Sequence, residues 1–254
     1  MTAPSAASAG QASRALRARA DPVKAALLAG YFKTGTGQYG EGDRFLGITV
    51  PSLREVARQY RALSLAQCRK LLASRFNEER ALALMILVDQ YRRGDAATRA
   101  AIHRLYLKDR GRVNNWNLVD GSAPTLLGLH LRERPRTILD RLAASASLWD
   151  RRIAVLASFA FIRDGDYSTT LRLVAGLLED PQDLLHKACG WALREVGKRD
   201  RAVLERFLRR HQARMPRTML RYAIERLPVA QRRAWLGGRA TRRVNRMGSA
   251  ALMS

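Results

Sequence analysis

The chain is short of acidic residues. Its 254 residues contain 22 Asp and Glu against 46 Lys and Arg, which gives a formal net charge of +24 at pH 7. Self-repulsion on that scale destabilises a compact chain unless a polyanion usually shares its surface, so nucleic acid is the leading partner. An anionic membrane surface and compositional drift are the alternatives. A GC-rich genome explains why only six of the basic residues are Lys, but not two bases for every acid.

Cysteine and histidine are scarce and show no metal-ligand spacing. Cys68 and Cys189 lie far apart in helix-like segments. We interpret both as small buried thiols in a reducing compartment. None of the histidines pairs with a cysteine or a second histidine at ligand spacing, so we expect no metal site. The four histidines are His103, His130, His186 and His211.

Long apolar runs and common catalytic motifs are also missing. No run of about 18 apolar residues occurs, so the sequence predicts no membrane span. A Gly-x-Ser-x-Gly elbow and a Ser/His/Asp pattern are absent, which removes the common hydrolase routes. The Gly-x-x-x-x-Gly-Lys-Ser/Thr loop of a nucleotide site is absent too. We expect a cofactor-free monomer in the cytoplasm.

What the chain does contain is helical periodicity. Apolar residues make up 47% of it, which is ample for a packed core. A helix is expected from Asp21-Pro22, because proline is favourable in the first turn. Beyond Pro51, apolar positions recur every three or four residues, with breaks at Gly, Pro or Asp, which predicts an all-α fold. The predicted helices lie near 51–60, 64–74, 78–92, 96–107, 115–131, 135–145, 148–163, 168–179, 182–198, 200–211 and 216–226.

Similar helix-opening segments recur at intervals of very roughly 35 residues, beginning near 77, 115, 148, 185 and 217. This period suits two-helix repeats of the HEAT or armadillo kind. We therefore predict a right-handed α-solenoid that forms a single domain over 21–236. The second helix of each repeat would be buried, with its first turns along a concave basic groove. The side chains expected on that face are Arg80, Trp116, Asp120, Arg151 or Arg152, Lys187, Trp191, Arg194 and Arg221.

Three segments depart from this periodicity. Five glycines fall between Lys33 and Gly47, where a short β-hairpin or an extended loop fits and a helix does not. Residues 1–20 are rich in Ala, Ser and Arg and contain no acid, which predicts a disordered basic arm. An organelle transit peptide has the same composition, but nothing else indicates a eukaryotic source. Residues 237–254 are expected to form a disordered basic tail.

The most distinctive stretch runs from Asn114 to Pro124. In a helix, Trp116 and Asp120 stand four residues apart and project from one face. Because Pro124 has no N–H, it would leave the Asp120 carbonyl without its intrahelical partner, so the helix must be kinked or interrupted. The alternative is that Trp116 belongs to the core and Asp120 caps a second helix beginning near Pro124.

These residue types suit chemistry on a cationic group. Among arginines, Asp120 would stay charged, so it could stabilise positive charge or orient water rather than act as an acid. The indole faces of Trp116 and Trp191 attract cations by roughly 0.5–2 kcal/mol each when desolvated. Three arginines are candidates to clamp phosphates: Arg151, Arg152 and Arg194. Against this, a tryptophan at helical spacing more often belongs to the core, and a surface arginine is usually only solvated.

Four motifs carry a family resemblance: 45–51 (FLGITVP), 115–124 (NWNLVDGSAP), 148–154 (LWDRRIA) and 187–195 (KACGWALRE). From about Tyr31 to Trp235 the chain resembles bacterial DNA alkylation repair proteins of the AlkD-like, HEAT-repeat DNA glycosylase family. The resemblance implies a solenoid that grips duplex DNA and hydrolyses the N-glycosidic bond of N3- or N7-alkylated purines without base flipping. It also implies roles for particular residues: a catalytic carboxylate at Asp120, active-site indoles at Trp116 and Trp191, a backbone-gripping arginine at Arg152 and a groove tyrosine at Tyr31.

One departure from the family pattern leaves a second function open. The Gly-rich segment is longer than the best understood members require, and it resembles the hairpin of a subgroup thought to bind branched DNA without clear glycosylase activity. Lys33, Tyr39 and Arg44 could enter a groove or a junction. A structure-specific DNA-binding protein is therefore the main alternative, and a protein-binding helical solenoid is the third.

Overall fold

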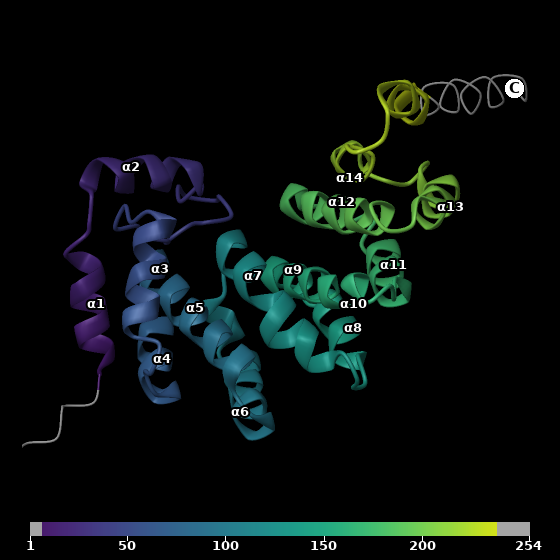
Figure 1. Cartoon of the computed structure of the whole chain (residues 1–254). Coiled ribbons are helices and arrows are strands. Elements are labelled where there is room, and N and C mark those ends of the chain that lie inside the picture. Colours follow the sequence, from purple (N-terminus) through teal and green to yellow (C-terminus); the bar gives the residue numbers. More distant parts are fainter. Residues whose placement is uncertain (1–6, 238–254) are drawn as a thin grey trace, which may run out of the picture. The chain divides into compact units, whose positions relative to one another are not determined.

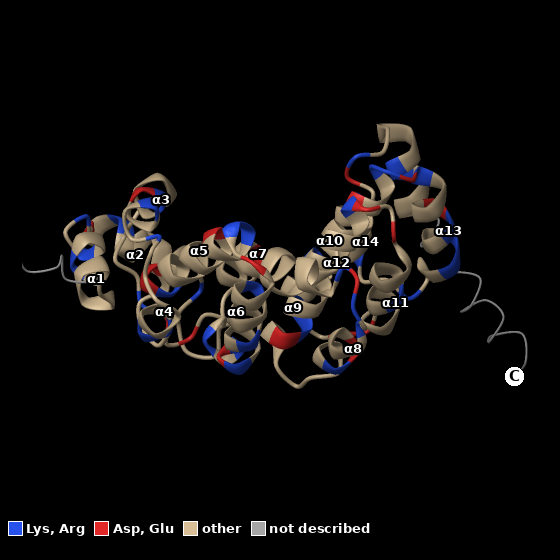
Figure 2. Ribbon diagram, turned by 60° about the horizontal axis from the view of Figure 1, so that its bottom comes forward, with Lys and Arg blue, Asp and Glu red and all other residues tan. Residues whose placement is uncertain are grey.

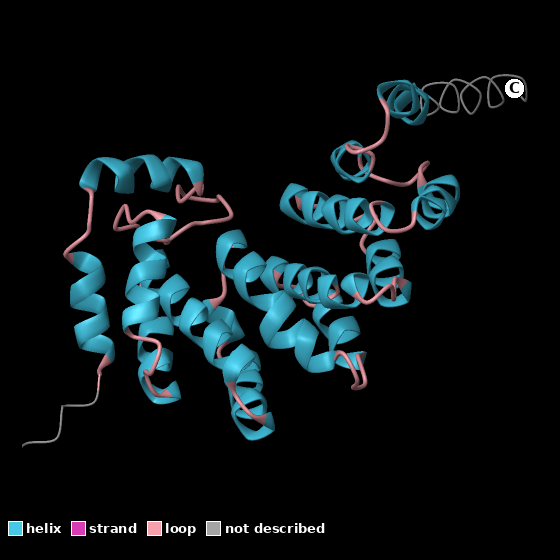
Figure 3. Cartoon of the chain, viewed as in Figure 1, coloured by secondary structure: helices cyan, strands magenta, loops and turns pink. Residues whose placement is uncertain are grey.

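The computed structural model describes residues 7–237, and these residues contain helices and loops but no strand (Figure 3). The all-α prediction is confirmed. Contacts divide the chain into two compact units, Met1–Pro135 and Arg136–Ser254, where the sequence predicted one domain over 21–236. In a repeat array each element contacts mainly its neighbours, so a regular period gives no sign of where one compact unit ends.

The first unit is organised around α5, which packs against α3, α4, α6 and α7 (Figure 1). Both faces of α5 are largely buried, which is why its apolar pattern is not amphipathic. Polar caps set several helix starts: Asp21 accepts hydrogen bonds from the backbone N–H groups of Val23 and Lys24 at 3.1 Å. The helices are α1 (Ala9–Arg17), α2 (Pro22–Tyr31), α3 (Val50–Gln59), α4 (Leu65–Leu72), α5 (Asn77–Arg93), α6 (Ala96–Lys108) and α7 (Trp116–Ala123).

The second unit is organised around α12, which contacts α9, α10, α11, α13 and α14. Gly190 allows α12 and α14 to approach closely, because a Cβ there would lie 2.5 Å from the Met219 carbonyl oxygen. The helices are α8 (Thr137–Ala143), α9 (Leu148–Ala157), α10 (Phe159–Arg163), α11 (Ser168–Gly176), α12 (Asp183–Gly197), α13 (Arg201–His211) and α14 (Arg217–Ala223), and residues 229–237 are also helical.

The N-terminal arm predicted to be disordered contains α1, so that prediction is wrong for Ala9–Arg17. Ser8 and Gln11 form a reciprocal capping box at its start. Leu16 is fully buried, and α1 packs on α3 and α4. The prediction rested on the overall composition of residues 1–20, which does not show that α1 has a short apolar face: Ala9, Ala12 and Leu16 are buried. Residues 1–6 and the predicted tail from 238 to 254 lie outside the described residues, whereas Gly237 is helical.

The helix containing Asp120 is interrupted at Pro124, as the sequence predicted. The α-helical pattern of α7 stops at Ala123 and gives way to a π-helical turn, Pro124–Gly128, and then a 3-10 turn, Leu129–Leu131. The backbone stays helical at Ala123 and Pro124. Asp120 therefore lies inside α7, and the alternative in which it caps a second helix is wrong.

Charged residues are spread along the described part of the chain. Lys and Arg occur along both units, with Asp and Glu among them (Figure 2). None of the helices in residues 7–237 combines the length and apolar character that a membrane crossing requires.

Candidate functional site

The start of α7 holds the indole and carboxylate predicted to be central. The Asn115 side chain caps this helix by accepting a hydrogen bond from the Trp116 backbone N–H at 2.8 Å. Trp116 and Asp120 follow one helical turn apart and are both half-buried. Trp116 is therefore neither a solvated surface residue nor a fully buried core residue.

Aromatic contacts fix the position of the Trp116 ring. The indole stacks on Phe32 with a centroid separation of 4.9 Å and an interplanar angle of 11°, and Phe32 stacks on Phe45 at 4.7 Å. Tyr31 meets the indole edge-on at 5.9 Å and is itself 66% exposed. The sequence singled out Tyr31 but missed Phe32, which was visible only as the last apolar residue of a predicted helix.

The Gly-rich segment is an extended loop with turns rather than a hairpin. Gly37, Gly42 and Gly47 adopt positive φ angles, which suits glycine. The loop runs beneath α2 (Figure 1) and ends where Arg44 exchanges backbone hydrogen bonds with the start of α5. Of the predicted DNA contacts here, Lys33 and Arg44 are exposed.

Tyr39 is the third predicted DNA contact in the loop and is half-buried, with its hydroxyl donating to the Tyr31 carbonyl at 3.3 Å. The end of α2 and this loop thus share one surface with the first turn of α7. The structure brings together here Tyr31, Tyr39 and Trp116, and Lys33 and Arg44 are exposed residues of the same loop.

Arg80 was predicted to face DNA, and that prediction is wrong. The side chain is almost fully buried, forms an ion pair with Asp43 and donates to the Ser74 carbonyl at 3.0 Å. Its place at a repeat opening suggested an exposed first turn, but the Gly-rich loop covers that turn. Asp43, which the sequence did not single out, is the partner that makes this burial possible.

In the second unit, Trp191 on α12 is half-buried and meets Phe159 edge-on at 4.8 Å. Its indole N–H donates to Glu195 at 3.2 Å. Burial alone would raise the pKa of Glu195, but Lys198, Trp191 and Arg194 outweigh it and hold that pKa below its usual value. Glu195 is therefore a charged group that orients the Trp191 ring.

The other predicted DNA contacts of the second unit, Arg194, Lys187 and Arg221, differ in how exposed their side chains are. Arg194 is half-buried and pairs with Glu225, and Lys187 pairs with Asp183 at 2.7 Å. Arg221 on α14 is exposed. The surface of this unit therefore offers Arg221 and the partly exposed Lys187 to a polyanion.

The predicted phosphate clamps Arg151 and Arg152 are mainly structural. Arg151 pairs with Asp180 at 2.6 Å and donates to two carbonyls of the loop before α9. Arg152 is 5% exposed, and its Nη1 donates to the Leu184 carbonyl at 2.7 Å, which joins α9 to α12. The prediction of a side chain on the groove face is wrong for Arg152, which is buried, whereas for the half-buried Arg151 it stays a prediction. Adjacent arginines at a helix opening resemble a surface patch, and only packing shows which carbonyls they satisfy.

Two histidines that are distant in sequence stack in the first unit, with His103 and His130 ring centroids 3.8 Å apart. Burial lowers the pKa of both, and that of His130 falls to about 4.

Within residues 7–237, no group of three or more His, Cys, Asp or Glu could hold a metal ion. Cys68 and Cys189 are buried free thiols, and burial raises the pKa of each to about 12.

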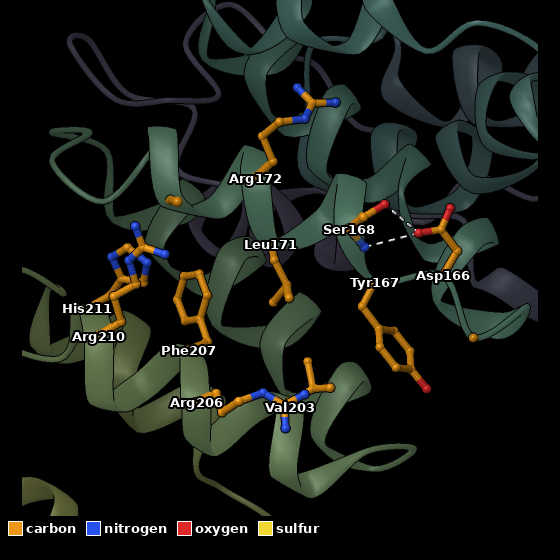
Figure 4. Close-up of a pocket in the computed structure, with 12 residues that line it drawn as sticks. Asp166, Tyr167, Ser168, Leu171, Arg172, Val203, Arg206, Phe207, Arg210 and His211 are labelled. Carbon is orange, nitrogen blue, oxygen red and sulfur yellow. Dashed lines mark hydrogen bonds between the residues drawn. The ribbon is translucent and has the colours of Figure 1, made fainter.

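A groove of about 700 Å³ lies between α11 and α13 (Figure 4). Leu171, Val203 and Phe207 form its apolar part, and Arg206 and Arg210 lie at its edge (Figure 4). None of the predicted site residues lines it. Among the residues drawn, Ser168 donates hydrogen bonds to Asp166 through its backbone N–H and its hydroxyl.

The described part of the chain is all-helical and strongly basic, and it sets an indole and a carboxylate one turn apart on α7. Together these features fit the class of helical proteins that act on nucleic acid. Comparison with known families makes the assignment specific. The family model described as DNA alkylation repair enzyme matches residues 12–227, and the chain belongs to that family. The family resemblance of the sequence is thereby confirmed.

A solved structure supports the fold. The protein described as "Predicted DNA alkylation repair enzyme from Enterococcus faecalis" superposes with a TM-score of 0.63 at 16% sequence identity. The match covers 83% of this chain and 98% of that one. No curated protein sequence matches the chain.

Proposed function

We propose that the protein is a DNA glycosylase that binds duplex DNA and hydrolyses the N-glycosidic bond of N3- or N7-alkylated purines. The observation that carries the proposal is the start of α7. There Trp116 and Asp120 lie one turn apart and half-buried, and aromatic stacking fixes the indole. Membership of the DNA alkylation repair enzyme family supports the same reaction class.

Hydrolysis of this N-glycosidic bond requires groups that stabilise positive charge, and Trp116 and Asp120 supply them. An alkyl group on N3 or N7 makes the purine cationic and hence a good leaving group, so no general acid is required. Positive charge then develops on the deoxyribose, where a preorganised carboxylate stabilises the transition state more than the ground state. Asp120 faces the sugar and positions the attacking water, and the Trp116 face accommodates the cationic sugar and base.

We carry over Trp191 from the family resemblance as a second active-site indole; within the second unit its ring is oriented by its hydrogen bond to Glu195. The base stays stacked in the duplex, so a base-binding pocket is not needed. None of the proposed site residues lines the groove between α11 and α13, in keeping with this. No cofactor takes part.

Duplex DNA is the proposed partner, bound by a monomer in the bacterial nucleoid. The net charge of +24 supports a polyanion. The accessible cations proposed to contact phosphate are Lys33, Arg44, Lys187 and Arg221. Arg151 and Arg152 support the site by joining α9 to its neighbours.

The direct test uses a duplex that carries one 7-methylguanine. The duplex is incubated with excess protein and then heated in alkali, which cuts the strand at an abasic site. Strand cleavage at the lesion supports the glycosylase. An intact strand, with the duplex still bound, contradicts it.

Non-catalytic binding of branched DNA is the second candidate, and it is supported by the exposed Lys33 and Arg44 of the Gly-rich loop. It predicts tighter binding of a four-way junction than of a duplex and no cleavage in the alkali assay. A protein-binding solenoid is the third candidate. It predicts a partner affinity that changes little between 50 and 200 mM salt, whereas phosphate contacts predict a steep loss over that range.

A further inference from the structure

The carboxylate of Asp43, near the end of the Gly-rich loop, is buried against α5 and α7. Its side chain is 4% exposed, and its ion-pair partner Arg80 is 5% exposed. The Oδ2 atom accepts hydrogen bonds from the side-chain amides of Asn77 at 2.9 Å and Asn115 at 2.7 Å. A buried charge is tolerated only when it is paired and hydrogen-bonded in this way. Asp43 therefore requires partners from both helices at once.

The network continues into the first turn of α7. Asn115, held by Asp43, accepts the hydrogen bond from the Trp116 N–H. Asn117, on the other side of Trp116, exchanges amide hydrogen bonds with Asn77 at 2.7 and 3.3 Å. The residue before Trp116 is thus tied to the loop, and the residue after it is tied to α5.

The backbone of the Gly-rich loop is fixed on both sides of Asp43 by close packing and by hydrogen bonds. Gly40 packs so closely that a Cβ there would overlap the Phe32 carbonyl oxygen. On the other side, the buried Glu78 accepts hydrogen bonds from three successive backbone N–H groups, those of Leu46, Gly47 and Ile48, at 2.9 to 3.3 Å. Phe45, between these anchors, reaches the indole through the Phe32 stack.

We propose that Asp43 is a positioning residue for the reaction: through Asn115 it orients the first turn of α7, and with it the Trp116 indole relative to Asp120. The inference rests on the proposed glycosylase function. It gives the Gly-rich loop a role in bracing the site, through Asp43 and Phe45, in addition to the phosphate contacts proposed for its exposed Lys33 and Arg44. A displaced indole would slow the chemical step, because misplacement by about 1 Å can cost on the order of 100-fold in rate.

Two variants cut the connection at different points. Asp43→Asn removes the charge that Arg80 and the two amides share. Asn115→Ser keeps a good helix cap but loses the amide that reaches Asp43. The matched control is Glu41→Gln, which neutralises an exposed carboxylate of the same loop that accepts only from the Gly37 N–H.

Excision of 7-methylguanine is measured in single turnovers over a range of protein concentrations, which separates the maximal rate from the half-saturating concentration. We expect both variants to lower the maximal rate about tenfold or more while the half-saturating concentration stays within about twofold. The control should match the wild type. A merely structural role would instead change the thermal midpoint and leave the rate of the folded fraction unaltered.

A spectroscopic readout keeps the inference testable apart from the activity. The Trp116 signal is taken as the difference in acrylamide quenching between each protein and its Trp116→Phe derivative. We expect greater quenching in Asp43→Asn and Asn115→Ser than in Glu41→Gln. If the wild type does not excise the lesion, the proposed function fails, and quenching alone decides the positioning role. Unchanged quenching, or an unchanged maximal rate in folded variants, overturns the inference. If Asp43→Asn does not fold, Asn115→Ser carries both measurements.

Discussion

Gly190 permits a close contact between α12 and α14 that a side chain would disturb, and replacing it tests how α12 is held. A Cβ at this position would lie 2.5 Å from both the Met219 carbonyl oxygen and the Tyr222 Cβ. Neither atom is the end of a flexible side chain, so α14 must shift to make room. Because α12 also carries Trp191, the shift would reach the proposed site.

The expected cost of Gly190→Ala follows from overpacking, which typically destabilises by about 1–3 kcal/mol. The gain in helix propensity from Gly to Ala, about 1 kcal/mol, offsets part of it. A matched control is Gly176→Ala at the end of α11, where a Cβ would meet nothing within 4 Å. There we expect a stabilisation of about 0.4–1 kcal/mol, because the unfolded chain loses conformational freedom.

Urea denaturation followed by far-UV circular dichroism measures both variants against the wild type. The two substitutions add the same atoms to helices of the same unit, so the difference between them isolates the contact with α14. A Gly190→Ala protein as stable as Gly176→Ala would refute the reasoning about this contact.

Two further predictions concern protonation and salt. Because burial lowers the pKa of His130 to about 4 from 6.5, the unfolded chain binds more protons than the native one between these pH values. The free energy of unfolding should therefore fall as pH is lowered from 6.5 towards 4, and His130→Phe should flatten this slope in urea titrations; equal slopes would contradict the account. Lys33→Gln and Arg44→Gln should each reduce the salt dependence of duplex binding by a slope of about 1, measured by fluorescence anisotropy. Lys108 is an exposed lysine at the end of α6, and Lys108→Gln should leave that slope unchanged. If all three substitutions lower the slope equally, the effect comes from net charge alone and the proposed phosphate contacts of the loop are wrong.

Local signals in the sequence predicted the elements well because they act within a few residues. Asp21-Pro22 opens α2 with a side-chain cap and a preset φ angle. Pro124 interrupts the helix of Asp120 for the reason that the missing N–H dictates. Ser158, which carries no such signal, separates α9 from α10 inside one predicted helix.

What the sequence could not reveal depends on partners far along the chain. The burial of Arg80 needs Asp43, and that of Arg152 needs the Leu184 carbonyl. The sequence separation of these pairs does not indicate that they are in contact. The aromatic support of Trp116 likewise comes from Phe32, which directly follows α2. Family motifs located the indole and the carboxylate, but only the structure revealed what holds them.

The central claim is that the Asp120 carboxylate acts on the sugar in the transition state. The most direct measurement compares single-turnover excision of 7-methylguanine by wild type and Asp120→Asn, with Asp89→Asn as a control on α5. We predict that Asp120→Asn lowers the rate by about 10²–10³-fold, the usual cost of removing one preorganised electrostatic contact, and leaves the duplex affinity unchanged. An Asp120→Asn protein that excises at the wild-type rate would contradict the account.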